Sequence, residues 1–424
     1  MKSIRGDEAA GGGLLKRRSF LSLTTGVGAA GVLSAWPAGA QEGFEALPVW
    51  MRTLGGPEAP YGAPSKYEQH VQRVRGKVLP QNAGFAIWHS PLETQRGIIT
   101  PSGLHFVINH NGSPDVNPEQ HRLLIHGMVD RPLSFDVESL LRYPMTTGIH
   151  FLECSGNTAA NALSPTARDD DCTALFGQVS GSEWCGVPLS VLLREAGVKP
   201  KAKWVIAEGA DGGSHARSIP LAKVLDDAVV ALYQNGERLR PSQGYPMRLF
   251  LPGWEGNACV KWLHRLEVTD APAYTKDESG VYSEVLSDRD IQRFSFHMDV
   301  KSVITHPSGR QQLPEPGLYE VSGLAWSGLG TIAEVQVSAD GGKTWARASL
   351  SQPVLDKSLT RFTIPWQWDG QRTALLSRAV DSTGRVQPTR ASWKARYAAH
   401  SFNHYNAVQA WEVRADGRVA NVYV

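Results

Sequence analysis

One cysteine stands out for its setting, because Cys154 lies between an apolar run and the turn-forming Ser155-Gly156-Asn157 in the stretch HFLECSGNTAANA. A lone cysteine there is a buried apolar residue, half of a disulfide, or the centre of a functional site. The other cysteines, Cys172, Cys185 and Cys259, complete no CxxC or histidine-rich spacing of the kind that zinc or haem sites use. Four cysteines are also too few for a disulfide framework in 424 residues. A bond between Cys172 and Cys185 and a pair of free thiols remain equally open.

The overall charge and composition exclude several classes of protein. Lysine and arginine number 43 against 41 aspartate and glutamate residues, so the chain lacks the strong basic field that binds nucleic acid. Hydrophobic residues make up 42% of the chain, which is typical of a globular protein. A length of 424 residues exceeds one ordinary core and indicates roughly two or three domains.

Residues 1–40 have the pattern of a cleavable export signal. The segment LLKRRSFLSLTTGVGAAGVLSAWPAGA has a basic start, a short apolar run interrupted by glycines, and small residues at 38–40. The pair Arg17-Arg18, followed by Ser19-Phe20-Leu21, resembles the twin-arginine type, which carries folded proteins across the bacterial inner membrane. The apolar run falls short of the roughly 20 strongly apolar residues of a membrane anchor. We therefore expect a mature periplasmic protein that begins near Gln41 and has no membrane span.

The chain after this signal begins with an arm and an α+β domain. Residues 41–65 are rich in proline and glycine, which indicates an arm or linker. Residues 66–290 mix short β-like runs with few helix candidates, so we predict an α+β domain there. The apolar spacing within it predicts helices near 134–142 and 189–196.

The residue pattern changes after about residue 295, which indicates a second domain. The segment TIAEVQVSADGGKTWARASL alternates with period two on both sides of a turn, and TALLSRAVDSTGRVQP repeats the pattern. Short strands at this spacing over 295–400 predict an immunoglobulin-like β-sandwich. The tail, 401–424, is aromatic and apolar for a terminus, so we expect it to dock on another part of the protein.

Several ordered blocks around Cys154 resemble the sulfite oxidase family of molybdenum enzymes. These blocks are LECSGN at 152–157, AEGAD at 207–211, YPMR at 245–248, and PGWEGN at 252–257 running into VKWL. The family has a molybdopterin domain followed by an immunoglobulin-like dimerisation domain, so the similarity covers nearly the whole mature chain. The resemblance therefore implies a mixed molybdopterin-binding domain over 66–290 and a dimerisation domain over 295–400.

The resemblance implies that the thiolate of Cys154 is the protein ligand of molybdenum, and a soft thiolate suits such a metal. A pterin with an anionic phosphate needs cations, which Arg248 supplies as a bidentate contact and Lys261 as a point charge. Asp211 has the alternative role of a turn residue in GADGGS, and Gln243 replaces a family histidine, which leaves that contact open. The implied pterin contacts are Asn109, His110, Asp211, Arg248, Cys259, Val260 and Lys261.

Tyr282, in SGVYSEV, lies where the family places its active-site tyrosine. The resemblance implies that its phenol contacts an oxygen of the metal or of the substrate, and the alternative is an ordinary half-buried aromatic residue. The acidic residue that normally precedes it is replaced by Val281. Cys154 and Tyr282 are therefore the candidate catalytic residues, while His215, His297, His306 and His404 are expected to be surface or structural residues.

The chain departs from sulfite oxidases at the positions that bind the substrate dianion. Ile108 in FVINH and Ala159 in CSGNTAAN occupy positions where that group has arginines. A third arginine also has no clear counterpart in LTRFTIPWQW, although Arg361 lies nearby. Free sulfite would therefore meet an uncharged wall.

Within the family, this combination looks like the sulfane dehydrogenase subunit of bacterial thiosulfate oxidation. That resemblance implies a substrate sulfur carried as a cysteine persulfide on a carrier protein, and a homodimer of this chain within a heterotetramer. The chain has no CxxCH for haem, so the electrons are expected to leave through a c-type dihaem cytochrome subunit. Two alternatives stay open: a periplasmic sulfite dehydrogenase, and a cofactor-free periplasmic binding or assembly module.

Overall fold

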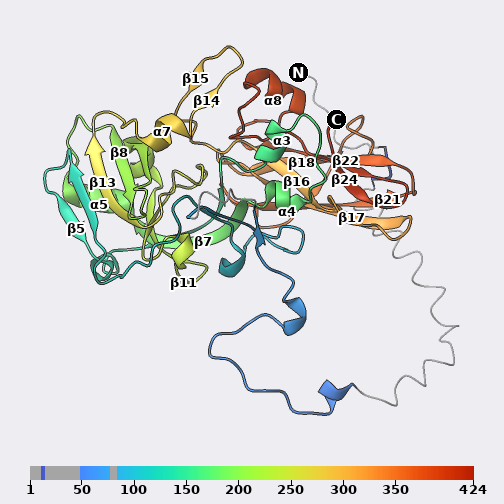
Figure 1. The fold of residues 1–424 in the computed structure, drawn as a ribbon, viewed down its shortest axis with the longest axis horizontal. Helices are drawn as coiled ribbons and strands as arrows, with labels where there is room; N and C mark the ends of the chain where they lie inside the picture. Colours follow the sequence, from blue (N-terminus) through green and yellow to red (C-terminus); the bar gives the residue numbers. More distant parts are fainter. Residues whose placement is uncertain (1–10, 15–47, 77–83) are drawn as a thin grey trace.

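The computed structural model describes residues 11–14, 48–76 and 84–424. Most of the expected signal segment therefore lies outside the described residues. The described chain forms two lobes, the first mainly from residues 84–292 and the second from residues 295–424, with the short helices α3 (Ala159–Leu163) and α4 (Cys172–Phe176) lying beside the strands of the second (Figure 1). The blue arm, drawn below the lobes in Figure 1, extends away from both of them. Among the described residues, four 3-10 helices lie in the arm and the first lobe: η3 (Val49–Met51), η4 (Lys66–Glu68), η5 (Ser102–Leu104) and η6 (Pro241–Gln243).

Two five-stranded sheets frame the first lobe. One has the order β11-β10-β7-β6 with β12 paired to β10, and the other has the order β5-β4-β13-β8-β9. A smaller sheet, β1-β2-β3, and the hairpin β14-β15 complete the strands of this half of the chain. The strands are β1 (Val74–Arg75), β2 (Ala86–His89), β3 (Val107–Asn109), β4 (Leu123–Gly127), β5 (Leu133–Phe135), β6 (Thr146–Glu153), β7 (Val179–Pro188), β8 (Trp204–Gly209), β9 (Ala216–Pro220), β10 (Val229–Gln234), β11 (Glu237–Arg238), β12 (Arg248–Phe250), β13 (Leu263–Thr269), β14 (Glu284–Val285) and β15 (Ile291–Gln292).

The helices are short and cover the sheets. Helix α5 forms because Leu189, Leu192, Leu193 and Ala196 recur at helical spacing, and all four are fully buried. It ends at Gly197, whose φ of 73° is the left-handed conformation that commonly stops a helix. The helices are α2 (Val137–Leu140), α3 (Ala159–Leu163), α4 (Cys172–Phe176), α5 (Leu189–Ala196), α6 (Leu221–Asp226), α7 (Lys276–Gly280) and α8 (Arg390–Arg396).

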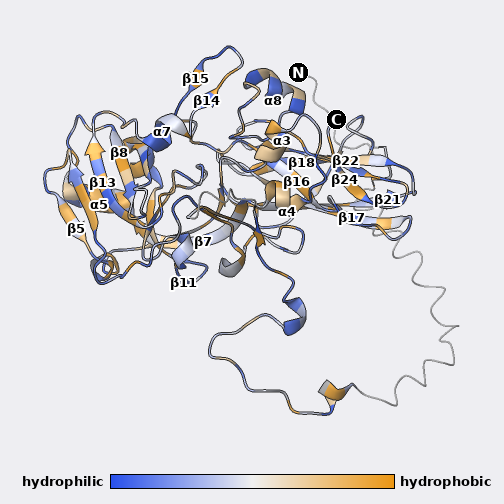
Figure 2. Ribbon diagram, in the orientation of Figure 1, coloured by the Kyte–Doolittle hydropathy of each residue, from blue (hydrophilic) through white to orange (hydrophobic). Residues whose placement is uncertain are grey.

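The second lobe is a β-sandwich of sheets β16-β17-β21-β20 and β19-β18-β22-β23-β24. Their apolar side chains share one core in which Trp326, Trp366 and Trp411 are fully buried, and Figure 2 shows apolar residues concentrated on the strands. The segment 401–424 supplies β23 and β24, so the aromatic tail belongs to this sheet. The predicted α+β fold with a second, sandwich domain is confirmed. The strands are β16 (Lys301–His306), β17 (Gly317–Trp326), β18 (Ile332–Ser338), β19 (Ala346–Arg347), β20 (Ser349–Leu350), β21 (Thr360–Trp368), β22 (Thr373–Asp381), β23 (Ala410–Val413) and β24 (Val419–Val422).

The two lobes share packing. Phe151, Leu175 and Phe176 of the first lobe belong to the apolar core of the second. The buried Lys301 ammonium of β16 lies 2.9 Å from the Glu153 carboxylate at the end of β6. The strand that precedes Cys154 is therefore fixed from the second lobe.

Residues 11–14 lie along strand β21. The backbone amide of Gln367 donates to the carbonyl oxygen of Gly13 at 2.7 Å, and the Trp366 indole donates to that of Gly12 at 2.7 Å. Leu14 is buried in the core of the second lobe. This short part of the expected signal segment thus packs on the sandwich.

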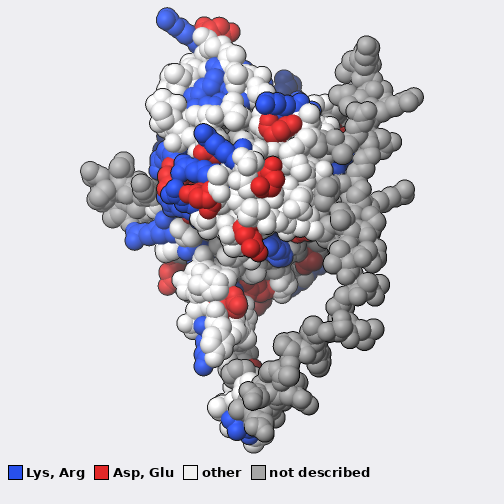
Figure 3. Space-filling view, turned by 90° about the vertical axis from the view of Figure 1, so that its right-hand side faces the viewer, with Lys and Arg blue, Asp and Glu red and all other residues white. Residues whose placement is uncertain are grey.

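The surface charge and the state of the cysteines can be compared with the expectations from the sequence. The face of the molecule in Figure 3 carries basic and acidic side chains intermixed, which agrees with a net charge of +2. All four cysteines are free thiols, so Cys172 and Cys185 are not paired. Within the described ranges, no helix has the length and apolarity needed to cross a membrane.

Candidate active site

A cavity in the first lobe is lined by residues from several separate segments of the chain. Strand β3, the loop after β6 and the loops that follow β8 and β12 supply its walls. Every residue predicted from the sequence to contact the metal, the pterin or the substrate lines this cavity: Asn109, His110, Cys154, Asp211, Arg248, Cys259, Val260, Lys261 and Tyr282. Side chains from six separate segments thus meet at one place.

Cys154 begins a tight turn directly after β6. Its amide donates to the carbonyl oxygen of Gln178 at 3.0 Å, and the amide of Asn157 donates back to the Cys154 carbonyl at 2.9 Å. Burial of the thiol raises the pKa of Cys154 to about 12. The thiol therefore stays protonated, and a protonated thiol is a poor free nucleophile.

Glu153, the residue before Cys154, accepts hydrogen bonds from three side chains. The Glu153 carboxylate accepts from the Lys301 ammonium at 2.9 Å, from the Asn157 amide at 2.9 Å and from the Trp326 indole at 2.6 Å. Glu153 is fully buried, so these partners compensate a charge that has no access to water. The turn that presents Cys154 is consequently fixed by both lobes.

Arg248 brings an unpaired positive charge to the cavity. Its guanidinium is buried, donates to the carbonyl oxygens of Cys259 at 2.8 Å and Gln243 at 3.2 Å, and has no carboxylate partner among the described residues. Burial lowers the pKa of Arg248 to about 10, and its Nε has no hydrogen-bond partner there. A buried cation of this kind is costly unless an anion joins it, so the site fits the phosphate of a pterin cofactor.

Lys261 supplies a second cation to the same cavity. Its ammonium donates to the carbonyl oxygen of Ile108 at 2.8 Å and to the side-chain oxygen of Asn109, and it lies 4.8 Å from the centre of the Trp262 ring. Burial and the nearby Arg248 lower the pKa of Lys261. Both cations would regain favourable charge balance when a dianion binds, which is the fit expected for molybdopterin.

A group of histidine, acid and tyrosine side chains forms another wall. The Tyr282 hydroxyl lies 3.4 Å from Nε2 of His110, and Nδ1 of His215 lies 3.4 Å from the Asp277 carboxylate. His110, His215 and Asp277 could together approach one cation. However, Nε2 of His215 already bonds the Asn257 carbonyl oxygen at 2.8 Å, so both of its nitrogens are engaged. Burial, with His215 and Lys261 nearby, lowers the pKa of His110 to about 4, so this ring is neutral.

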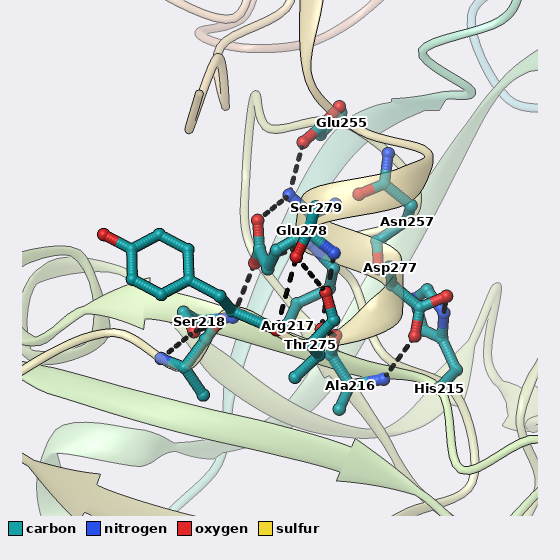
Figure 4. Close-up of polar contacts among 12 residues, drawn as sticks. His215, Ala216, Arg217, Ser218, Glu255, Asn257, Thr275, Asp277, Glu278 and Ser279 are labelled. Carbon is teal, nitrogen blue, oxygen red and sulfur yellow. Dashed lines mark hydrogen bonds and ion pairs between the residues drawn. The ribbon is translucent and has the colours of Figure 1, made fainter. Parts of the chain in front are cut away.

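Arg217 lies behind this wall, between two carboxylates (Figure 4). Its guanidinium is 3.0 Å from Glu255 and 2.8 Å from Glu278, and its carbon is 4.7 Å from the centre of the Tyr282 ring. Burial alone would lower the pKa of Arg217, but the two carboxylates raise it above its usual range. Arg217 thus remains charged beneath the phenol.

The wall beside Cys154 lacks the arginines of sulfite-binding enzymes. Ile108 lines the cavity, and Ala159 lies outside its lining as the first residue of α3. Arg361, whose alignment was open, donates to the carbonyl oxygens of Gly97 at 3.1 Å and Gln95 at 3.3 Å, away from the site. Arg248 is the one arginine among the described lining residues.

Some lining residues were not predicted as site residues. His215 and Asn257 line the cavity, and the Gln243 amide, left open from the sequence, donates to the Phe106 carbonyl oxygen at 2.8 Å. Gln243 therefore supports the wall and Arg248. The PGWEGN block pointed to Asn257, whereas no spacing in GADGGSH distinguished His215 from a turn residue.

Comparison with known proteins matches each lobe to a protein-family model. A family model described as "Oxidoreductase molybdopterin binding domain" matches residues 110–276. A second, described as "Mo-co oxidoreductase dimerisation domain", matches residues 292–410. The two models follow each other in the order expected from the sequence.

Relatives and a solved structure agree. NADH nitrate reductase of Ulva prolifera is 28% identical over 341 residues, which cover 70% of this chain and 39% of that protein. NADH nitrate reductase 1 of Arabidopsis thaliana is 31% identical over 365 residues, covering 76% and 39%. This chain thus spans about two fifths of these relatives. The crystal structure of the sulfane dehydrogenase SoxCD from Paracoccus pantotrophus matches with a TM-score of 0.88 and 41% identity, over 92% of this chain and 100% of that chain.

The cavity, the two domain matches and this structural likeness agree on one assignment. They favour an oxidoreductase over the cofactor-free binding module. The match to a molybdopterin-binding domain identifies the type of cofactor as molybdopterin. The chain belongs to the sulfite oxidase family of molybdopterin oxidoreductases.

Proposed function

We propose that this chain oxidises the sulfane sulfur of a cysteine persulfide that a carrier protein presents, and passes the electrons to a c-type cytochrome subunit. The observation that carries the proposal is Ile108 in the wall of a cavity that keeps Cys154 and Tyr282. A substrate tethered to a protein is positioned by its carrier, so it does not need an arginine clamp. The likeness to a structure named sulfane dehydrogenase supports the same substrate class.

Cys154 would hold the molybdenum through its thiolate. Arg248 and Lys261 would neutralise the pterin phosphate, and polar contacts to the pterin would come from Asn109, His110, Asp211 and residues 259–260. The bound group supplies two-electron oxidation of sulfur with oxygen from water. The cofactor would supply only this chemistry. The protein would position the sulfur and control access to it.

The protein must also handle protons, because each oxygen that enters from water releases two protons and two electrons. Burial raises the pKa of Tyr282 well above its usual range, so its phenol stays protonated and donates a hydrogen bond to an oxygen on the sulfur. Neutral His110 lies 3.4 Å from that phenol and can orient it through a hydrogen bond. Ile108 leaves this wall without charge, which disfavours a free dianion.

We also propose the assembly and the location that the sequence predicted. The second lobe would form a homodimer of this chain, and a c-type dihaem cytochrome subunit would complete a heterotetramer. The dimerisation-domain match supports the homodimer, and the name SoxCD supports a second type of subunit. The Arg17-Arg18 pair supports export of the folded protein to the periplasm by the twin-arginine route.

Steady-state turnover tests the substrate. The holoenzyme with its cytochrome is given either persulfide-loaded carrier protein or free sulfite, and cytochrome reduction is followed. We expect the carrier-bound persulfide to give a kcat/KM at least roughly tenfold higher than sulfite, since the loss of one charge-assisted contact at position 108 is worth about that much. Efficient oxidation of free sulfite would instead support the sulfite dehydrogenase alternative.

A further inference from the structure

Residues 402–404, which we call the tail clamp, lie directly against the loop that carries Cys154. The His404 amide donates to the Ser155 carbonyl oxygen at 2.8 Å, and the Ser155 hydroxyl donates to the Asn403 side-chain oxygen at 3.1 Å. The Phe402 ring lies beside Gly156, where a side-chain carbon would stand 3.7 Å from it. The tail clamp therefore touches both residues that follow the cysteine.

Asn403 of the tail clamp also reaches the loop of Tyr282. The Asn403 amide nitrogen donates to the carbonyl oxygen of Val281 at 3.4 Å. Asn403 thus bridges the turn after Cys154 and the residue before Tyr282. Because Asn403 is 4% exposed, water competes little for either bond.

His404 joins the tail clamp to the ion pairs beneath Tyr282. Its Nε2 lies 3.1 Å from one oxygen of the Glu255 carboxylate, and the other oxygen lies 3.0 Å from the Arg217 guanidinium. Figure 4 shows Arg217 between Glu255 and Glu278. Glu255 and Arg217 are fully buried, so loss of one partner leaves a charge without compensation.

The tail clamp is anchored on both sides by the second lobe. Before it, Trp393 and Tyr397 of the α8 region pack with Tyr405 in a small apolar cluster, and the Trp393 indole donates to the His404 carbonyl oxygen at 3.3 Å. After it, the chain enters β23 of the sandwich. His404 has a left-handed backbone with a φ of 53°, which is uncommon for a residue other than glycine and persists where surroundings fix it.

We propose that the tail clamp is a positioning element of the active site. Asn403 sets the turn of Cys154 against the loop of Tyr282, and His404 acts on the Tyr282 ring through Glu255 and Arg217. The second lobe thereby sets the relative placement of the two candidate catalytic groups of the first. The proposal rests on the proposed function in one respect, since it assumes that Cys154 and Tyr282 act in the reaction.

The first experiment uses the full chain without cofactor. Alkylation of Cys154 by iodoacetamide is followed by peptide mass spectrometry in the wild type and in Asn403→Ala and His404→Ala. We expect the rate at Cys154 to rise roughly tenfold in both variants, because the turn is released, while the buried Cys172 and Cys259 stay unreactive. His400→Ala, at an exposed histidine four residues earlier, is the matched control and should leave the rate unchanged. Equal rates at Cys154 in all variants would overturn the proposal.

The second experiment uses the loaded enzyme. His404→Ala should lower kcat by roughly tenfold or more with KM for the persulfide-loaded carrier within about twofold, because alignment and not binding is lost. His404→Gln, whose side-chain amide can still donate to Glu255, should recover most of kcat. The electron paramagnetic resonance spectrum of reduced molybdenum should change in His404→Ala but not in His404→Gln. A rise in KM alone, or no rescue by glutamine, would contradict a positioning role. If the wild type fails to oxidise the persulfide, the proposed function fails, while the alkylation rates still decide the tail clamp.

Discussion

Burial raises the pKa of Cys154, so its thiol is protonated and a poor nucleophile. Its protonated thiol and the fully bonded Glu153 beside it make a poor nucleophile but a fixed ligand position. We predict that Cys154→Ser reduces turnover to background and changes the free energy of unfolding by only about 1 kcal/mol, since the change conserves volume. Turnover and urea unfolding of the purified variant check this, and an active serine variant would remove Cys154 from the metal.

Ile108 lines the cavity, so it is the position at which the proposed substrate preference can be tested. We predict that Ile108→Arg raises the affinity for sulfite or sulfate by roughly tenfold or more, because a charge-assisted hydrogen bond contributes about 1.5–3 kcal/mol. Isothermal titration calorimetry of the holoenzyme measures it. Ile108→Met, of similar size and without charge, is the control and should bind neither anion better. Unchanged anion binding in the arginine variant would mean that position 108 does not face the substrate.

Two buried arginines should respond in opposite ways to the same substitution. Within the described part of the chain Arg248 has no carboxylate partner, so Arg248→Met should leave the melting temperature of the cofactor-free chain unchanged or higher while it lowers the molybdopterin content at least roughly tenfold. Arg217 bridges Glu255 and Glu278, so Arg217→Met should cost about 3–5 kcal/mol of unfolding free energy. Calorimetry of both variants checks the contrast. A large loss of stability in Arg248→Met would show that its charge is already compensated.

At the scale of elements, local patterns predicted some boundaries well. The range 189–196 predicted from apolar spacing is the full extent of α5. The range predicted at 134–142 contains only α2, Val137–Leu140, because Ser134 pairs in β5 and the Asp136 side chain caps the helix. Helices α3 and α4 have five residues each, too few for a periodic signal, and the packing of the two lobes holds them.

The sequence predicted most of the site residues, but it did not predict which distant segments contact one another. The ordered blocks gave the lining residues, since each block carries its own motif, and all of them meet in one cavity. The contacts of His215 and of the tail join segments far apart in the chain, such as Ser155 with Asn403. No local pattern encodes such pairs, so His404 was expected only to be a structural residue.

The contact between the tail and the PGWEGN loop should make stability depend on pH. Burial alone would lower the pKa of His404, but the Glu255 carboxylate, with Glu284 and Asp299 farther away, raises it above its usual range. A raised pKa contributes stability that is full below about pH 6.5 and is lost as the pH rises through the folded-state value. We predict that the free energy of unfolding falls over this interval in the wild type and falls less in His404→Gln. Urea titrations between pH 5.5 and 8.5 measure this, and identical slopes would contradict it.

At the scale of the molecule, a buried ion pair joins the two lobes. Lys301 of β16 holds the Glu153 carboxylate at 2.9 Å, and both side chains are nearly inaccessible to water. We predict that Lys301→Met costs about 3–5 kcal/mol, because Glu153 keeps a buried charge with no cation. Urea unfolding checks the value. The exposed Lys343 of the β18–β19 turn offers a matched control, and a similar loss in Lys343→Met would show a general effect of removing a lysine.

The core of the second lobe includes Phe151, Leu175 and Phe176, which come from the first. The second lobe therefore does not complete its interior alone, and a break in the first exposes apolar surface in the second. The protein should melt as a single cooperative unit, with equal calorimetric and van't Hoff enthalpies, although its sequence divides into two domains. Protease cleavage between the lobes would then follow global unfolding, and limited digestion would yield no stable half-molecule.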